Sequence, residues 1–445
     1  MKIKNILLAV LVVSAFSCED FIGGDLNADP NKPLSVPITG QIGQVQISIA
    51  DVYGSSFSRW NSLFTQQVEG VARQWSSFNQ YQIQAIRFDD SWGDMYENVI
   101  GELRGITAIA EDNEFNHYLG VAKVLEATAI MNMTDVWGDI PYTEAGLGAE
   151  NFSPTFDDQA TVIYPAVLRL FNEALVLFAG SAGAIAPGGE DLYYGGDIAS
   201  WIKATNALKA RYHLHLSQYA EALAAANASF SSRSDNMSYQ YGADPASGGW
   251  YRFNNGREGD IEFHPTMRGF MTALNDTDRL SVMDQTFTIN GTPHPYMIAA
   301  FRQDLISYRE IQFVIAECEF RLNGNTQTVA GHTAYLNGIN ASFVELGFDS
   351  EGDEYDDYVG QATIDPGAAL ITLNDIMMQK YIGLFVQPEV FNDWRRTNIP
   401  ALTPVSGTTI PTNWDYAQQT YLFNSNAPDP ITAPQSLMRG VDWVN

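Results

Sequence analysis

The sequence predicts a mostly α-helical fold, and three observations support this prediction. Apolar residues recur at helical spacing through much of the chain, as in the segment from His117 to Met133. Several such segments start at residues that favour helix beginnings, among them Asp304 and Pro388. Many follow one another in pairs with short connections, which predicts antiparallel helical hairpins. The sequence shows no strict repeat period.

Size and charge limit the classes of function that the chain can have. Its 445 residues, 45% of them hydrophobic, are enough for a sizeable core. The net charge of −28 argues against a nucleic-acid-binding protein, which needs basic residues to displace counterions. The same charge argues against docking on an anionic membrane surface. We therefore expect no nucleic-acid partner.

The N-terminus reads as a targeting segment. Lys2 and Lys4 precede a short apolar run, Ile6–Phe16, which is too short to cross a bilayer. A plain secretory signal is one interpretation. The favoured one is a lipoprotein signal over residues 1–17, with Cys18 as the lipidated first residue of the mature chain. Residues 18–41, rich in Gly and Pro, would form a lipid-anchored tether, and residues 42–445 a single domain.

The helices follow from the hydrophobic pattern. We expect them at Gln44–Tyr53, Phe57–Arg73, Ser91–Glu111, Glu114–Met133, Gln159–Phe178, Ile198–His215, Ser217–Phe230, Asp304–Asn323, Ala330–Leu346, Thr372–Val386 and Pro388–Thr397. Two long segments, Ser232–Thr266 and Ala401–Asn445, lack helical periodicity. Both are much longer than ordinary connections, so we interpret them as functional loops or as coil wrapped on the helical scaffold.

The stretch Met131–Ala145 joins an apolar helix to an irregular turn. Gly138 permits a positive φ, and Asp139 has a side chain that can accept hydrogen bonds from free backbone N–H groups of the turn. Trp137 and Tyr142 add large apolar surfaces that can fix the corner. The residues alone predict a structural, helix-ending corner.

Signatures of catalysis and of metal binding are absent from the sequence. It contains no phosphate-binding Gly-Lys-Ser/Thr loop, no nucleophile elbow and no His-Glu-x-x-His. His213 and His215 lie two residues apart in an expected helix and so point in different directions. The segment Asp25–Val36 resembles the start of a calcium loop but fails at Pro30 and Val36, and Asp349–Asp357 is more simply a solvated acidic loop. We expect neither a cofactor nor a metal.

Glu310 and Glu317 share one face of an expected helix. Two carboxylates can cleave a glycosidic bond, but these are about 10 Å apart along the helix, at the outer limit for an inverting pair. The favoured interpretation pairs them with basic residues such as Arg309, Arg321, Arg395 or Arg396. Cys318, in the same helix, is expected to be a small buried apolar residue.

Aromatic residues in polar and Gly-rich surroundings supply the candidate ligand site. Arg73–Tyr96 and Tyr239–Phe253 interleave aromatic residues with Gln, Asn and Gly. Sugar rings pack on aromatic faces, while Arg and amide groups bond their hydroxyls. A single aromatic residue is more often packed than ligand-binding, so we select those with the most polar or Gly-rich neighbours. The predicted binding residues are Arg73, Trp75, Tyr81, Trp250 and Tyr251.

Several motifs together resemble one family. In order, they are the lipoprotein start through Cys18, Asp25–Pro33, Trp137–Tyr142 with Glu144 and Ala145, Ala207–Leu216, Leu274–Leu280, Tyr308–Glu317, Gln379–Phe385 and Phe391–Pro400. This ordered set, which spans nearly the whole chain, resembles the SusD/RagB family of nutrient-binding outer-membrane lipoproteins of Bacteroidota, in its SusD-like branch. The tail from Asn413 onward departs from the ending expected for that family.

The resemblance implies a SusD-like fold, in which tetratricopeptide-like hairpins support a loop-rich ligand-binding face. It also implies a non-catalytic lipoprotein, anchored by lipid at the cell surface in the outer membrane. Such a protein captures a glycan or oligosaccharide and delivers it to a TonB-dependent transporter barrel. The family motifs are scaffold and carry no binding residues. Two alternatives stay open: the same fold capturing peptides or another nutrient, and a carbohydrate hydrolase.

Overall fold

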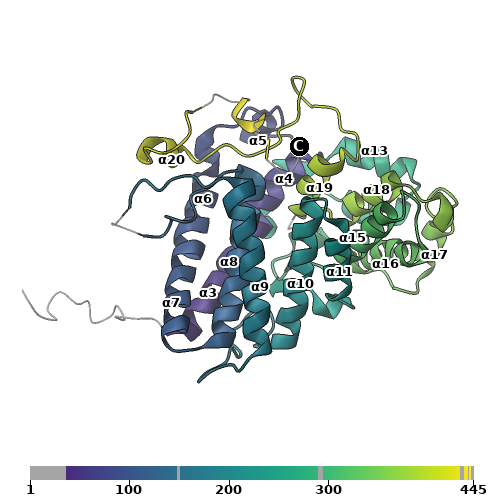
Figure 1. Ribbon diagram of the computed structural model, residues 1–445. Helices are drawn as coiled ribbons and strands as arrows, with labels where there is room; N and C mark the ends of the chain where they lie inside the picture. Colours follow the sequence, from purple (N-terminus) through teal and green to yellow (C-terminus); the bar gives the residue numbers. More distant parts are fainter. Residues whose placement is uncertain (1–36, 148–150, 289–293, 431–434, 439, 442–445) are drawn as a thin grey trace, which may run out of the picture.

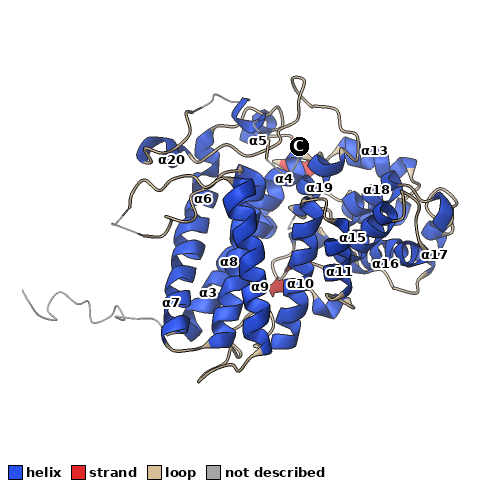
Figure 2. Ribbon diagram, in the orientation of Figure 1, coloured by secondary structure: helices blue, strands red, loops and turns tan. Residues whose placement is uncertain are grey.

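The computed structural model describes residues 37–147, 151–288, 294–430, 435–438 and 440–441. Helices dominate this part of the chain, and the strands are short (Figures 1 and 2). The predicted signal peptide, Cys18, most of the tether and the segment Asp25–Val36 lie outside the described residues. The division into signal, tether and single domain therefore stays a prediction.

The helices agree well with the sequence pattern, and Ile198–His215 has the expected bounds. In chain order the α-helices are α3 Ile38–Val52, α4 Ser58–Phe64, α5 Arg73–Phe78, α6 Asp89–Met95, α7 Glu102–Asp112, α8 Asn116–Trp137, α9 Tyr164–Ala179, α10 Ile198–His215, α11 Tyr219–Asn227, α12 Gly249–Arg257, α13 Pro265–Ala273, α14 Thr277–Met283, α15 Tyr308–Leu322, α16 Val329–Glu345, α17 Asp353–Val359, α18 Leu373–Gly383, α19 Glu389–Thr397 and α20 Gln418–Phe423.

Shorter helical segments extend or connect these elements. The π-helical segments are η2 Tyr53–Phe57, η4 Tyr96–Gly101 and η6 Gln159–Ile163, and the 3₁₀ turns are η3 Ala85–Phe88, η7 Arg233–Asp235, η8 Pro295–Met297, η9 Ala368–Leu370 and η10 Gln435–Met438. Because η4 joins α6 to α7 without a break, the segment forms one long helical rod with a wider turn at Tyr96–Gly101.

Successive helices pack as hairpins, as the sequence predicts. Helices α8 and α9, α10 and α11, and α15 and α16 form close pairs, and α11 also packs on α15. In Figure 1, α7, α8, α9, α10 and α11 stand side by side, with α15 to α18 beside them. The loop-rich face, which includes α5 and α20, lies across the upper ends of the α6 to α10 helices (Figure 1).

Two predicted helices have the wrong bounds, because two small antiparallel sheets take up part of their residues. Strand β1, Val68–Gly70, pairs with β3, Ile261–Phe263, and β2, Met237–Gln240, pairs with β4, Arg302–Ile306. The helix expected over Phe57–Arg73 therefore ends at Phe64, since pairing with β3 takes up the backbone of the following residues.

The helix expected from Asp304 also begins later. Asp304 lies inside strand β4, so the helix starts after Ser307, whose hydroxyl accepts a hydrogen bond from the Glu310 backbone N–H at 3.3 Å. Long-range strand pairing decided both helix boundaries, and no local pattern in the sequence reports it.

The segments expected to be irregular differ from each other. Ser232–Thr266 contains β2, α12 and β3, so it is more regular than expected. The described part of Ala401–Asn445 is mostly coil around α20, as expected.

The corner after α8 is structural, as predicted. Helix α8 continues to Trp137 and ends at Gly138, whose φ is +80°. The indole of Trp137 is buried and donates to the Asp415 carbonyl oxygen at 3.0 Å. The Asp139 carboxylate accepts from the backbone N–H of Gln159, the first residue of η6, at 2.8 Å.

The carboxylates of α15 form buried ion pairs, as the favoured interpretation expected. The Arg396 guanidinium donates two hydrogen bonds of 2.7 Å to the Glu317 carboxylate. Arg211 forms a bidentate pair of the same kind with Glu310, also with two bonds of 2.7 Å. Arg396 was among the partners considered, whereas Arg211 was not, because it comes from the distant helix α10. Cys318 is fully buried beside them, as expected.

A candidate ligand-binding groove beside α6 and α20

Three of the predicted binding residues are buried, so the prediction that they face a ligand is wrong for this structure. The exposed fractions are 5% for Trp75, 3% for Tyr81 and 3% for Trp250. The Trp250 indole donates to the Ser58 hydroxyl at 2.8 Å, and the Tyr81 hydroxyl accepts from the Val405 backbone N–H at 3.2 Å. These aromatic groups therefore stabilise the core instead of offering a flat face to a sugar.

The two aromatic segments do meet, but they meet inside the molecule. Phe253 packs edge-on against Trp75, with ring centroids 5.3 Å apart, and against Trp250 at 6.3 Å. Trp75 also lies 5.0 Å from Trp60. The polar neighbours in the sequence did not keep these rings at the surface, because apolar partners far along the chain cover them.

Arg73 and Tyr251 are accessible. The Arg73 guanidinium pairs with the buried carboxylate of Asp260 at 2.5 Å and donates to the Glu258 carbonyl oxygen at 3.0 Å, although half of its side chain is exposed. Tyr251 is half-buried at the start of α12. Their roles in ligand binding stay predictions.

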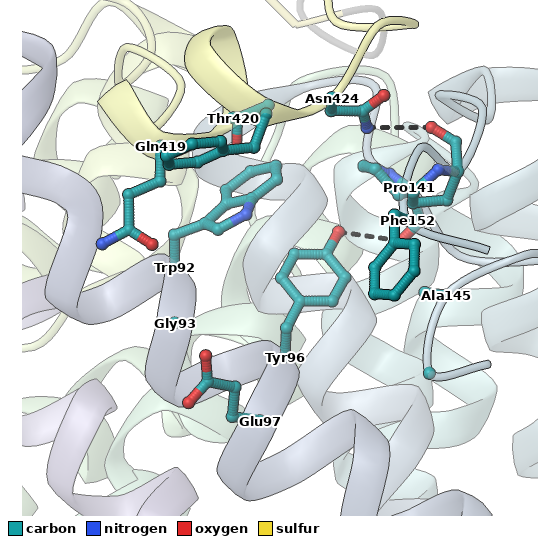
Figure 3. Close-up of a pocket in the computed structure, with 13 residues that line it drawn as sticks. Trp92, Gly93, Tyr96, Glu97, Pro141, Ala145, Phe152, Gln419, Thr420 and Asn424 are labelled. Carbon is teal, nitrogen blue, oxygen red and sulfur yellow. Dashed lines mark hydrogen bonds between the residues drawn. The ribbon is translucent and has the colours of Figure 1, made fainter. Parts of the chain in front are cut away.

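A groove with exposed aromatic side chains lies elsewhere on the loop-rich face (Figure 3). It encloses about 250 Å³. The lining residues come from α6 and η4, from the turn after Pro141, from a loop around Phe152, and from α20. They are Trp92, Gly93, Tyr96, Glu97, Pro141, Ala145, Gly146, Phe152, Pro154, Gln419, Thr420, Phe423 and Asn424. We call this cavity the aromatic groove.

The aromatic groove has a fixed inner wall and an exposed rim. Trp92 and Tyr96 lie one helical turn apart, with ring centroids 4.9 Å apart, and Trp92 also packs edge-on against Trp137 at 5.0 Å. The rim carries Phe152, which is 78% exposed, and Phe423, which is 75% exposed. Large apolar side chains this exposed, gathered around a cavity, are typical of a ligand-binding site.

Hydrogen bonds between the loops hold the groove in shape. The Tyr96 hydroxyl donates to the Pro141 carbonyl oxygen at 2.7 Å, and the Asn424 amide donates to the Pro154 carbonyl oxygen at 2.9 Å (Figure 3). The Asn426 amide donates to the Ser153 carbonyl oxygen at 2.6 Å. The two Asn bonds join the segment that follows α20 to the Phe152 loop, so the two exposed Phe residues belong to connected segments.

The electrostatic character of the groove suits an uncharged, hydroxylated ligand. Among the described residues that line it, Glu97 is the only charged one, and the amides of Gln419 and Asn424 supply polar groups. Burial of the phenol, with the nearby Tyr416 and Asp157, raises the pKa of Tyr96 far above its ordinary value of 10.0. Tyr96 therefore stays a neutral hydroxyl at physiological pH.

The described part of the chain holds no group of three or more His, Cys, Asp or Glu arranged to bind a metal ion. His215, in particular, faces Glu389 and Asp135 in the core instead of a cavity.

None of the binding residues predicted from the sequence lines the aromatic groove. Trp92 and Tyr96 belong to the aromatic stretch Arg73–Tyr96, and Phe423 belongs to the long C-terminal segment that was expected to be functional. Phe152 was missed. The signal for both exposed Phe residues is their setting, since each is followed by Asn, Ser or Pro within a loop-like stretch.

Comparisons with known proteins agree with this architecture. Residues 30–416 match the model of a SusD-like family described as starch-binding and associating with the outer membrane. No curated protein matches the sequence.

Solved structures share the fold at low sequence identity. A SusD/RagB family protein from Bacteroides thetaiotaomicron is 19% identical, with a TM-score of 0.72 over 92% of this chain and 99% of its own. A chitin-binding SusD homologue from Flavobacterium johnsoniae is 19% identical, with a TM-score of 0.73 over 92% of this chain and 98% of its own. A further structure, named a chitin-binding protein, is 20% identical, with a TM-score of 0.73 and the same coverages, 92% and 98%. By the match over residues 30–416, the chain belongs to the SusD-like family of starch-binding proteins that associate with the outer membrane.

Proposed function

We propose that the protein captures a glycan or oligosaccharide in the aromatic groove and does not cleave it. The observation that carries this proposal is the pair of exposed rings, Phe152 and Phe423, on the rim of a cavity whose inner wall is aromatic. Sugar rings present C–H faces that pack on such side chains, and the neighbouring amides can bond their hydroxyls. Membership of a starch-binding family supports a carbohydrate ligand.

The finer parts of the function rest on the family resemblance. We infer that Cys18 anchors the protein by lipid at the cell surface, and that a TonB-dependent transporter barrel receives the captured glycan. The expected partner is therefore a membrane-embedded barrel in addition to the glycan. Purifying the full-length lipoprotein in detergent tests this inference, because the barrel should co-purify in a stoichiometric amount.

The binding site is tested by calorimetric titration against a panel of starch, chitin and other neutral oligosaccharides. Phe423→Ala and Phe152→Ala should each lower the affinity by about ten- to a hundredfold, as truncation of an anchoring residue costs about 1–3 kcal/mol. Leu422→Ala is the matched control. Leu422 is 66% exposed on the same helix but does not line the groove, so this variant should bind like the wild type.

The outcomes separate the competing sites and functions. Unchanged affinity in both Phe variants, with a loss in Arg73→Ala and Tyr251→Ala, would move the site to the residues predicted from the sequence. Binding of peptides and of no glycan would favour the alternative nutrient. Release of new reducing ends during titration would identify a hydrolase.

A further inference from the structure

A second cavity, larger than the aromatic groove, lies on the neighbouring side of the same helical rod. It encloses about 450 Å³ between α3, the junction of α6 and η4, the end of β2 with the segment that follows it, and α12. Its lining residues are Gln44, Ile47, Ser48, Asp51, Val52, Asp94, Asn98, Tyr239, Tyr241, Pro245, Ala246 and Arg252. Asp94 and Asn98 are one helical turn apart and point away from Trp92 and Tyr96. We call this cavity the Asp94 pocket.

The walls of the Asp94 pocket combine aromatic and polar surfaces. Tyr239 and Tyr241 meet edge-to-face, with ring centroids 4.9 Å apart and planes at 87°. Tyr241 is buried and donates to the Asp51 carboxylate at 3.3 Å, which fixes its ring, whereas Tyr239 stays half-buried. Gln44 and Ser48, which lie on α3 and line the same cavity, supply an amide and a hydroxyl. A half-buried Tyr ring in a cavity with polar groups is suited to a sugar ring.

The two carboxylates of the pocket differ in whether a cationic side chain pairs with them. The Asp51 carboxylate pairs with Arg252, and the positive charge of Arg59 also attracts it. Asp94 accepts a hydrogen bond of 2.9 Å from the Asn98 amide, and it forms no ion pair within the described part of the chain. Burial raises the pKa of Asp94 above its ordinary value of 3.8. The hydrogen bond from Asn98 opposes this effect, and the negative charges of Asp51, Asp90 and Glu97 add to it. The negative charge at Asp94 is therefore the one that lacks a cationic partner.

We propose that the Asp94 pocket binds a sugar that carries a protonated amino group, with Tyr239 under the ring and Asp94 as the counter-ion of the ammonium. A free ammonium donates three hydrogen bonds, which suits the Asp94 carboxylate, the Asn98 carbonyl oxygen and the Ser48 hydroxyl. A neutral sugar would leave Asp94 without a partner, and an anionic sugar would be repelled by it. This second site is separate from the aromatic groove and does not depend on the function proposed for that groove.

The test compares oligomers of glucosamine, N-acetylglucosamine and glucose of equal length by calorimetry. We expect the glucosamine oligomer to bind about five- to tenfold more tightly than the others, and the preference to weaken as salt rises, because charge attraction is screened. Asp94→Asn should remove the preference, and Tyr239→Ala should weaken binding. In the protein with Phe152→Ala and Phe423→Ala, this preference should persist.

The controls address the large negative charge of the chain, which attracts any cation. Asp90→Asn removes a nearby carboxylate that does not line the pocket, and it should keep the preference. A lysine oligomer of equal charge should bind more weakly than the glucosamine oligomer. The proposal would be overturned if Asp94→Asn and Asp90→Asn lowered the preference for the glucosamine oligomer equally. It would also be overturned if the lysine oligomer bound as tightly as the glucosamine oligomer, because either result would indicate nonspecific charge attraction. Equal affinity for all three sugars in the wild type would overturn it as well, and thermal melts establish that each variant is folded.

Discussion

The Nε2 atom of His215 lies 2.7 Å from Oε1 of Glu389, and both side chains are fully buried between α10 and α19. On the other side of the ring, Nδ1 lies 3.6 Å from the Asp135 carboxylate. Burial alone lowers the pKa of His215, but the charges of Glu389 and Asp135 outweigh this effect and raise it from 6.5 to about 9. His215 is therefore a buried cation at neutral pH.

This pair predicts a loss of stability at alkaline pH. Because the folded-state pKa of His215 lies above its unfolded value, its contribution is complete below pH 6.5 and is lost as the pH rises to about 9. Urea unfolding of the wild type should show this decline. His215→Gln should cost about 3–5 kcal/mol at pH 6, because it removes a buried cation that faces both Glu389 and Asp135. The stability of this variant should change less over the same pH range.

His213→Gln is the matched control for this measurement. Burial lowers the pKa of His213, so His213 makes no contribution that is lost on going to alkaline pH. This variant should keep the alkaline decline of the wild type. A wild-type profile that stays flat between pH 6.5 and 9 would contradict the charge state that we assign to His215.

The corner at the end of α8 should be sensitive to truncation. The Trp137 ring packs on Trp92, Phe57 and Trp414, with centroid distances of 5.0, 5.7 and 5.4 Å. Trp137→Ala should therefore lower the free energy of unfolding by about 3–5 kcal/mol, as measured by chemical denaturation. It should also weaken glycan binding, since Trp137 supports Trp92 in the groove. Lost binding with an unchanged melting temperature would instead make Trp137 a direct ligand contact.

Two helical glycines should respond oppositely to the same substitution. A Cβ added at Gly120 would lie 2.5 Å from the Phe178 ring, so Gly120→Ala should destabilise the α8–α9 pair by about 1–3 kcal/mol. Gly105 in α7 is exposed and has nothing within 4 Å of such a Cβ. Gly105→Ala should therefore stabilise the protein by about 0.5–1 kcal/mol through helix propensity. Thermal and urea unfolding of both variants check the pair, and a similar sign for both would contradict the packing at Gly120.

The lipid anchor is tested by Cys18→Ala. We expect this variant to leave the membrane fraction, since stable anchoring needs the multiply acylated N-terminus that Cys18 would provide. The measurement is the share of the protein that stays in the membrane fraction after a high-salt wash. Ser17→Ala is the control at the neighbouring residue. A Cys18→Ala protein that stays with the membranes would show that another segment holds it there.

The sequence by itself determined most of the helical scaffold. Helical spacing of apolar residues is a local property, so α10 could be placed at its observed bounds and α8, α9 and α16 close to theirs. The corner at Gly138 was predictable for the same reason, because a residue that favours positive φ follows directly on an apolar helix. The ordered motifs also identified the family, which the match over residues 30–416 confirms.

Only the tertiary structure decided which aromatic residues face solvent. Trp75 and Phe423 are each followed by polar residues in the sequence, yet Trp75 is 5% exposed and Phe423 is 75% exposed. Trp75 is covered by Trp60 and Phe253, which α4 and α12 bring to it, whereas no such partner covers Phe423 among the described residues. Exposure depends on neighbours that are distant in the chain, and the strand pairs that moved the ends of α4 and α15 are equally long-range. For that reason local patterns predicted the helices but not the residues that line the grooves.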